Sequence, residues 1–116
     1  MTTETDLRVE CVELEKCLLV TVVGEAGVAA SAKMEREFTR IVARRPPVVV
    51  LDLTGLSFIS SLGMGALVGL QRGITGRGGK LRVAGMQDRV AEALRRAQLD
   101  RVMVFSPSVQ EAIAEA

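Results

Sequence analysis

The sequence contains no histidine, tryptophan or tyrosine, and its 116 residues include only two cysteines and three phenylalanines. Without histidine, the chain lacks the commonest general base and the commonest metal ligand of proteins. Cys11 and Cys17 are too few for a zinc site and are not spaced as C-x-x-C. We therefore expect no cofactor, no resident metal and no enzymatic activity of the chain's own.

The net charge and the length of the apolar runs argue against a nucleic-acid-binding protein and against a membrane-spanning protein. The 15 basic and 14 acidic residues leave a net charge of +1, without the basic excess that nucleic-acid binding uses, and aromatic residues make up only 3%. No apolar run reaches the roughly 18 residues of a membrane helix, and the polar N-terminus lacks a signal-peptide core. We predict no nucleic-acid partner, no direct membrane insertion and a cytoplasmic location.

Hydrophobic periodicity predicts nine elements in a single domain over residues 1–116. Strands are expected over 7–14, 17–23, 48–51, 81–84 and 102–105, and helices over 28–44, 61–73, 87–98 and 107–116. In this reading Gly24–Gly27 end the second strand, the third helix segment starts at Gln87, and Ser106 caps the last helix with Pro107 at its first position. The order is strand, strand, helix, strand, helix, strand, helix, strand, helix. Helical crossovers imply a parallel arrangement, so we predict an α/β fold with a mixed, mostly parallel sheet of about five strands.

The most informative stretch runs from Val48 to Leu70, VVVLDLTGLSFISSLGMGALVGL. An apolar, β-branched run predicts a buried strand, and Asp52 with the residues after it predicts a turn in which this carboxylate accepts a hydrogen bond. Ser60 and Ser61 then precede an apolar helical segment. Either serine suits a helix N-cap, so loss of Ser61 is expected to cost on the order of 1 kcal/mol. A hydroxyl at a helix N-terminus is also a favourable place for a phosphate.

The predicted helix after the two serines has almost no polar face. Leu62, Met64, Leu67, Val68 and Leu70 are interspersed with glycines that let another backbone approach closely. Two explanations stay open at this point. The segment packs tightly on its own sheet, or Leu62 and Met64 face a partner protein.

The sequence does not match two catalytic motifs that it superficially suggests. The nucleophile elbow G-x-S-x-G is absent around Ser61, and without histidine a Ser-His-Asp triad is impossible. Residues 73–80, GITGRGGK, superficially suggest a phosphate-binding loop, but Ile74 and Leu81 depart from the motif, and the loop connects a helix to a strand instead of a strand to a helix. We interpret it as a flexible turn.

Residues 51–65, LDLTGLSFISSLGMG, resemble the signature of STAS domains, the family of anti-sigma factor antagonists, whose pattern is a strand, D-L-S-G-V-x-F-x-D-S-S-G-L-G and a helix. Chain length, element order and Gly24-Glu25 after the second strand are similar as well. The resemblance implies a bacterial regulator of transcription that switches partners. It binds an anti-sigma factor with serine kinase activity, and a serine phosphatase resets it. The phosphorylated residue would be Ser61, with Ser60 as the alternative.

The resemblance further implies a partner-binding surface composed of Glu25, Ser60, Ser61, Leu62, Gly63 and Met64. The sequence differs from the family pattern at three places. Ser60 replaces an aspartate, Leu62 replaces the second serine, and Gly27 replaces the aspartate of a G-E-L-D turn. The loss of acidic neighbours motivates a second hypothesis. The chain would then be a STAS scaffold or accessory subunit that is not phosphorylated, in a stress-signalling complex or a lipid transporter.

Overall fold

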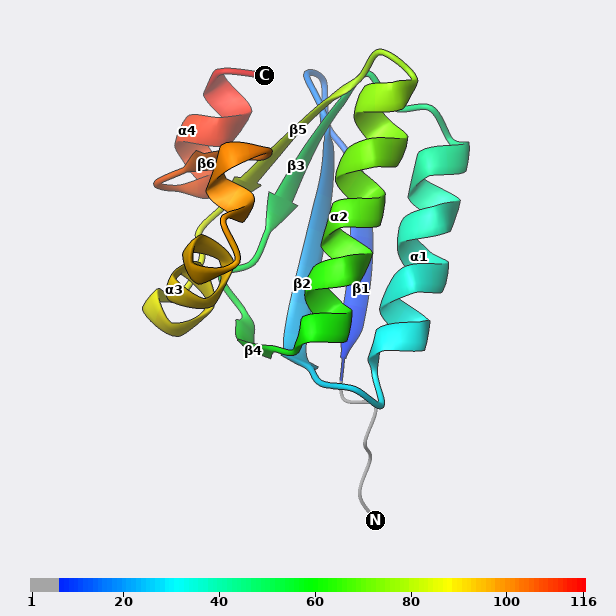
Figure 1. The fold of residues 1–116 in the computed structure, drawn as a ribbon. Helices are drawn as coiled ribbons and strands as arrows, with labels where there is room; N and C mark the ends of the chain where they lie inside the picture. The colour runs from blue at the N-terminus through cyan, green and yellow to red at the C-terminus, as the bar shows by residue number, and fades with distance from the viewer. Residues whose placement is uncertain (1–6) are drawn as a thin grey trace.

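The computed structural model describes residues 7–116, which form a mixed β-sheet with helices on both of its faces (Figure 1). The strands are β1 (Arg8–Glu13), β2 (Leu18–Ala26), β3 (Val48–Asp52), β4 (Leu56–Ile59), β5 (Lys80–Ala84) and β6 (Val104–Ser106). The main sheet has the order β1-β2-β3-β5-β6, and only β1 runs antiparallel to its neighbour. The predicted α/β class and mostly parallel sheet are confirmed.

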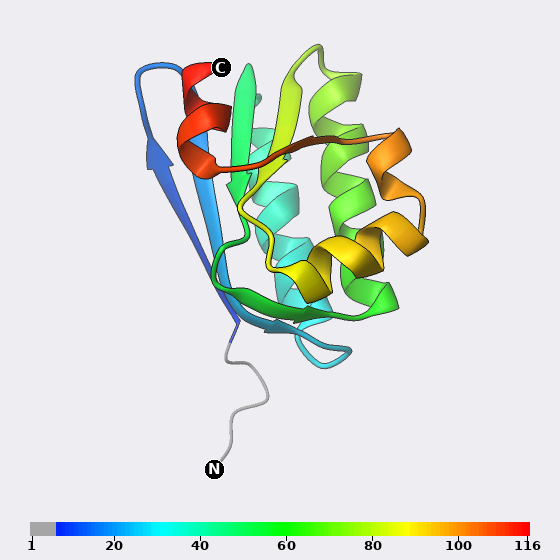
Figure 2. The ribbon, with the colours of Figure 1, turned by 90° about the vertical axis from the view of Figure 1, so that its left-hand side faces the viewer.

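Helices cover the two faces of the sheet unequally. The helices are α1 (Ser31–Ala43), α2 (Ser61–Gly76), α3 (Asp88–Arg96) and α4 (Val109–Ala114), with a short 3-10 helix, η1 (Leu99–Arg101). Helices α1 and α2 lie side by side on one face, whereas α4 lies on the other (Figures 1 and 2). Within residues 7–116, none of the helices combines the length and apolar character that crossing a bilayer requires.

The unbroken apolar run of β3 follows from its central position between β2 and β5. Val49 and Leu51 are fully buried in the main core under α1 and α2, while Val50 is fully buried in a smaller cluster under α4. Because successive side chains of a strand point to opposite faces, a strand covered on both sides needs apolar residues at every position. The sequence pattern of this strand is therefore explained by its packing.

The prediction that the second strand ends at Gly24 was wrong. β2 continues through Glu25 to Ala26, and its register shifts between Gly24 and Glu25, where Gly24 has a φ of 118°. Glycine adopts this conformation easily, and the bulge bends the strand so that its last residues pair with β4. Strand β4 is a sixth strand that the sequence analysis missed.

Two helix boundaries also differ from the predictions. Helix α2 continues past Gly73 to Gly76. Gly73 is a packing residue and not a C-cap, since an added Cβ there would lie 2.6 Å from Val42 Cγ2 of α1. Ser106 does not cap the last helix: it is a buried residue of β6. The N-cap of α4 is Ser108, whose hydroxyl accepts a hydrogen bond from the Glu111 N–H at 3.1 Å.

Candidate functional site

Three segments meet at one end of the sheet, where β2 ends, β4 runs and α2 begins (Figure 1). Glu25 of β2 is paired with Phe58 of β4, and Ala26 with Ile59. The backbone N–H of Ser60 then donates to the Ala26 carbonyl oxygen at 2.8 Å. The first turn of α2 is thereby fixed to the end of β2, so the sheet determines where the two adjacent serines lie.

Ser60 and Ser61 have different roles at the start of α2. Ser60 has an extended backbone (φ −88°, ψ 172°), and its hydroxyl accepts a hydrogen bond from the Gly63 N–H at 3.1 Å. Ser60 is therefore the N-cap, and Ser61 is the first residue inside the helix. The prediction of a serine cap is confirmed for Ser60. The expectation that Ser61 provides the cap was wrong.

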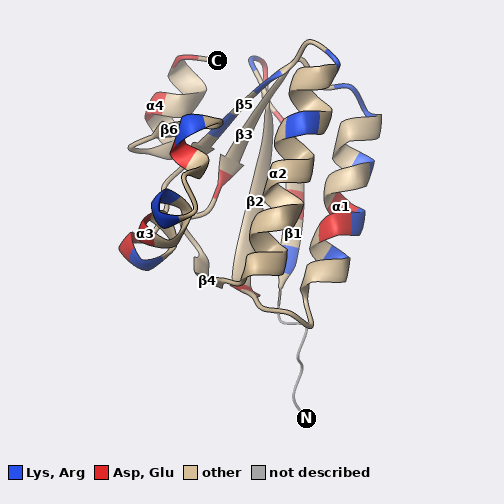
Figure 3. Ribbon diagram, viewed as in Figure 1, with Lys and Arg blue, Asp and Glu red and all other residues tan. Residues whose placement is uncertain are grey.

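Ser61 is exposed to solvent at the positive end of the α2 dipole. No charged residue occurs in α2 between Ser61 and Gln71, and this part of the helix is uncharged in Figure 3. The first turn also contains no acidic residue. A phosphate on Ser61 would therefore add charge to an uncharged segment of α2 while benefiting from the helix dipole.

The residues that follow Ser61 divide between the surface and the interior. Leu62 is 56% exposed, which is unusual for a large apolar side chain. Met64 is half-buried and packs against the main core. Gly63 is buried, and an added Cβ there would lie 2.9 Å from Ile59 Cγ1 and 3.0 Å from the Ala26 carbonyl oxygen. Gly63 therefore serves the packing of α2 on β2, and Leu62 is the residue that faces outward.

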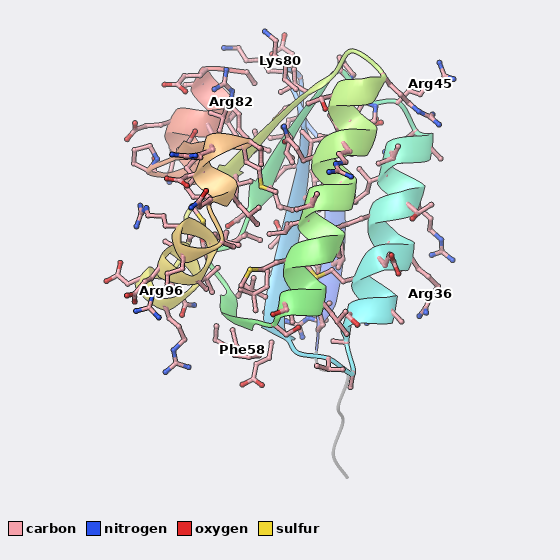
Figure 4. All side chains as sticks on the ribbon, viewed as in Figure 1. Arg36, Arg45, Phe58, Lys80, Arg82 and Arg96 are labelled. Carbon is pink, nitrogen blue, oxygen red and sulfur yellow. The ribbon has the colours of Figure 1, made fainter. Side chains whose placement is uncertain are left out.

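Two further apolar side chains at this end were missed by the sequence analysis. Phe58 is 41% exposed and lies where β4 leads into α2 (Figure 4), and Val28 is 67% exposed in the loop after β2. We call Val28, Phe58 and Leu62 the apolar patch. No pattern in the sequence indicates this exposure of Phe58, because strand alternation places it on the same side of β4 as the buried Leu56.

Three hydrogen bonds fix the turn that leads into β4. The Asp52 Oδ1 atom accepts a hydrogen bond from the Thr54 N–H at 2.9 Å, which confirms the turn role predicted for this carboxylate. The Gln87 side-chain amide donates to the Thr54 carbonyl oxygen at 2.9 Å, and the Leu53 N–H donates to the Ala84 carbonyl oxygen at 3.0 Å. The end of β5 and the loop after it therefore support the turn that leads into β4.

Nearly the whole of the chain matches a known family. A model of the STAS domain matches residues 8–112 of the chain. The chain belongs to the STAS-domain family. This match confirms the family that residues 51–65 resemble in sequence, and the observed mixed sheet with four helices is the STAS fold.

Solved structures share the fold of this STAS domain at low sequence identity. An anti-sigma factor antagonist from Mycobacterium paratuberculosis has a TM-score of 0.88 at 19% identity, with 99% of this chain and 97% of that chain covered. The Bacillus cell fate determinant SpoIIAA in its phosphorylated form has a TM-score of 0.68 at 16% identity, with 94% and 97% covered. A sulfate transporter family protein from Wolinella succinogenes has a TM-score of 0.70 at 23% identity, with 84% and 81% covered.

The described part of the STAS domain was compared with the side-chain groupings that hold metal ions. Within residues 7–116, no three Cys, Asp or Glu side chains come together in a group that could hold a metal ion. The features that this end does offer are an exposed hydroxyl, a helix N-terminus and exposed apolar side chains.

The separate roles of the two serines lead to a stability prediction for the STAS domain. Ser60→Ala is expected to lower the free energy of unfolding by about 1 kcal/mol, because the Gly63 N–H loses its side-chain acceptor. Ser61→Ala is expected to change it by less than about 0.5 kcal/mol, because Ser61 is exposed and is not the cap. Urea unfolding of both variants measures the difference, and equal losses would contradict the assignment of the cap to Ser60.

Proposed function

We propose that this STAS domain is an anti-sigma factor antagonist whose binding is controlled by phosphorylation of Ser61. The observation that carries the proposal is the exposed Ser61 hydroxyl at the start of α2, beside the exposed Leu62 and at the same end as Phe58 and Val28. Large apolar side chains left exposed at one end of a domain are candidates for a protein-binding surface. In this proposal, Glu25 and Ser60 border the surface, and Gly63 and Met64 support it from within.

The proposed partner is an anti-sigma factor with serine kinase activity. The unmodified domain binds this partner through the apolar patch, so that the sigma factor is released. The kinase then transfers the γ-phosphoryl group of ATP to Ser61 Oγ. A new O–P bond forms, the hydroxyl proton passes to a base on the kinase, and ADP leaves. A serine phosphatase later hydrolyses this ester with water and releases inorganic phosphate, so the STAS domain supplies only the hydroxyl.

The physical basis of the switch is a change of surface charge. Phosphorylation adds roughly −1.5 to −2 charges at pH 7. These charges would have to be desolvated beside Leu62 whenever the partner docks, and a charge buried without a partner is strongly unfavourable. Ser61 is preferred to Ser60 as the acceptor, because the Ser60 hydroxyl already accepts the capping hydrogen bond from the Gly63 N–H.

The experiment begins with capture of partners from the source organism on the purified STAS domain, followed by identification and purification of a bound kinase. Incubation with this kinase and ATP should add one phosphate, which mass spectrometry of peptides assigns to Ser61. Ser61→Ala should abolish the modification, whereas Ser60→Ala should keep it. Phosphate found only at another residue, or no bound kinase, would overturn the proposal.

A second candidate function is a constitutive subunit of a scaffold or a transporter. It is favoured by Ser60 and Leu62, which stand where the family pattern has an aspartate and a serine, and by the shared fold with a sulfate transporter family protein. In this case the same apolar patch binds a partner that is not a kinase. The genome neighbourhood separates the candidates: a kinase or sigma-factor gene supports the switch, and a permease or lipid-binding gene supports the subunit.

A further inference from the structure

A groove lies between α1 and α2, on the side of these helices that faces away from the sheet. Its volume is about 210 Å³. The buried Phe38, Ala66 and Leu70 and the half-buried Val42 give it an apolar floor. Glu35, Thr39, Gly65, Gly69 and Gly73 complete its lining.

The two helices that form the groove approach each other most closely near its Gly73 end. A Cβ on residue 73 would lie 2.6 Å from Val42 Cγ2. At the other end the lining begins with Gly65 and Ala66, which lie one turn after Ser61 and Leu62 on the same side of the helix. The groove therefore begins one helical turn after the proposed phosphorylation site and follows α2 from Gly65 to Gly73, over about 12 Å.

The packing of the chain does not explain why residues 65 and 69 are glycine. A Cβ at either position would meet no atom within 4 Å, whereas Gly63 and Gly73 are each closely approached by neighbouring residues. Glycine inside a helix is less favourable than alanine. The exposed side of α2 is also apolar from Leu62 to Gly69, although a helix that is apolar all round is normally covered.

The rim of the groove contains one carboxylate that has no ion pair with the described residues. Glu35 is exposed, while the nearby Glu37 is paired with Arg40 at 3.4 Å. A cationic side chain of a partner would therefore find an available acceptor directly beside the apolar floor.

We propose that this groove receives an α-helix of the anti-sigma factor kinase, which places a bulky apolar side chain over Gly65 and Gly69 and a Lys or Arg opposite Glu35. The inference rests on the proposed function and extends its surface from the tip of α2 along the helix pair. A helix fits because two neighbouring helices leave a groove that admits the side-chain ridge of a third. Absence of a Cβ at Gly65 and Gly69 lets the partner approach closely.

The test uses the kinase captured on the wild-type domain, purified and titrated against variants by calorimetry. Gly69→Leu fills the groove and is expected to weaken binding by roughly tenfold or more, as expected for loss of a central apolar contact. Gly76→Leu is the matched control: it lies on the same helix, meets no atom within 4 Å, does not line the groove and should change binding less than about twofold. Both variants and the wild type are expected to melt cooperatively.

A second variant tests the charge at the rim independently of the groove volume. Glu35→Lys should weaken binding, and the loss should shrink as salt is added, because exposed charges are screened. If the kinase binds the wild type while Gly69→Leu and Glu35→Lys bind equally well, the groove proposal is overturned and the proposed function stands. If no kinase binds the wild type, the proposed function fails, and the groove proposal fails with it.

Discussion

Ser61→Asp is expected to lower the affinity for the proposed partner, an anti-sigma factor kinase, by about 10- to 100-fold, or about 1.4–2.8 kcal/mol. The substitution places a negative charge beside the exposed Leu62, where docking would have to desolvate it. The fold should be unaffected or slightly more stable, by up to about 1 kcal/mol, because the introduced carboxylate would lie at the positive end of the α2 dipole. Calorimetric titration and a melting curve measure the two effects separately.

Two variants serve as controls for this result. Ser61→Ala removes the acceptor without adding charge and should bind as tightly as the wild type. Gln110→Asp adds the same charge to an exposed position on α4, on the opposite face of the sheet, and should also leave binding unchanged. If Ser61→Asp binds like the wild type, charge at this position is not the switch, and the constitutive subunit becomes the better explanation.

Gly85→Ala is expected to lower the free energy of unfolding by about 3 kcal/mol. Gly85 has a φ of 75°, a left-handed conformation that costs other residues roughly 1–2 kcal/mol. An added Cβ would also lie 2.5 Å from Thr54 Oγ1, and such overpacking typically costs about 1–3 kcal/mol. Urea unfolding should show a lower midpoint, and the loss should be accompanied by weaker protection from hydrogen exchange in β4.

The backbone and steric contributions at Gly85 can be separated. Gly78 has a similar φ of 85°, but an added Cβ would meet no atom within 4 Å, so Gly78→Ala should show only the backbone cost. Combining Gly85→Ala with Thr54→Ala should recover the steric part. Equal losses for Gly78→Ala and Gly85→Ala would show that contact with Thr54 does not matter.

The main elements of the fold could be predicted because their patterns are determined by local packing. The run Val48–Leu51 requires a strand covered on both faces, and the spacing of apolar residues requires helices over most of α1, α2 and α3. Strand β4 could not be found in this way. Its buried residues, Leu56 and Ile59, do not alternate, and its pairing with β2 depends on a bulge at Gly24 that is a tertiary feature.

The candidate site was predictable in part for a similar reason. The motif located Ser60, Ser61 and Leu62, but only the backbone geometry shows that Ser60 is the cap and Ser61 the free hydroxyl. The exposure of Phe58 does not follow from the alternation of β4, and the exposure of Val28 follows from the loop that the extended β2 leads into. Neither could be deduced from the sequence pattern.

The attachment of α2 to the end of β2 has a consequence for how fast a signal can be transmitted. The Ser60 N–H bond to the Ala26 carbonyl oxygen and the close packing of Gly63 anchor the acceptor residue to the sheet. Under the proposed mechanism, phosphorylation therefore requires no rearrangement of the domain. Without a slow conformational step, the response time would be set by the turnover of the kinase and the phosphatase. The domain would store the signal as the presence or absence of one phosphate, with the same fold in both states.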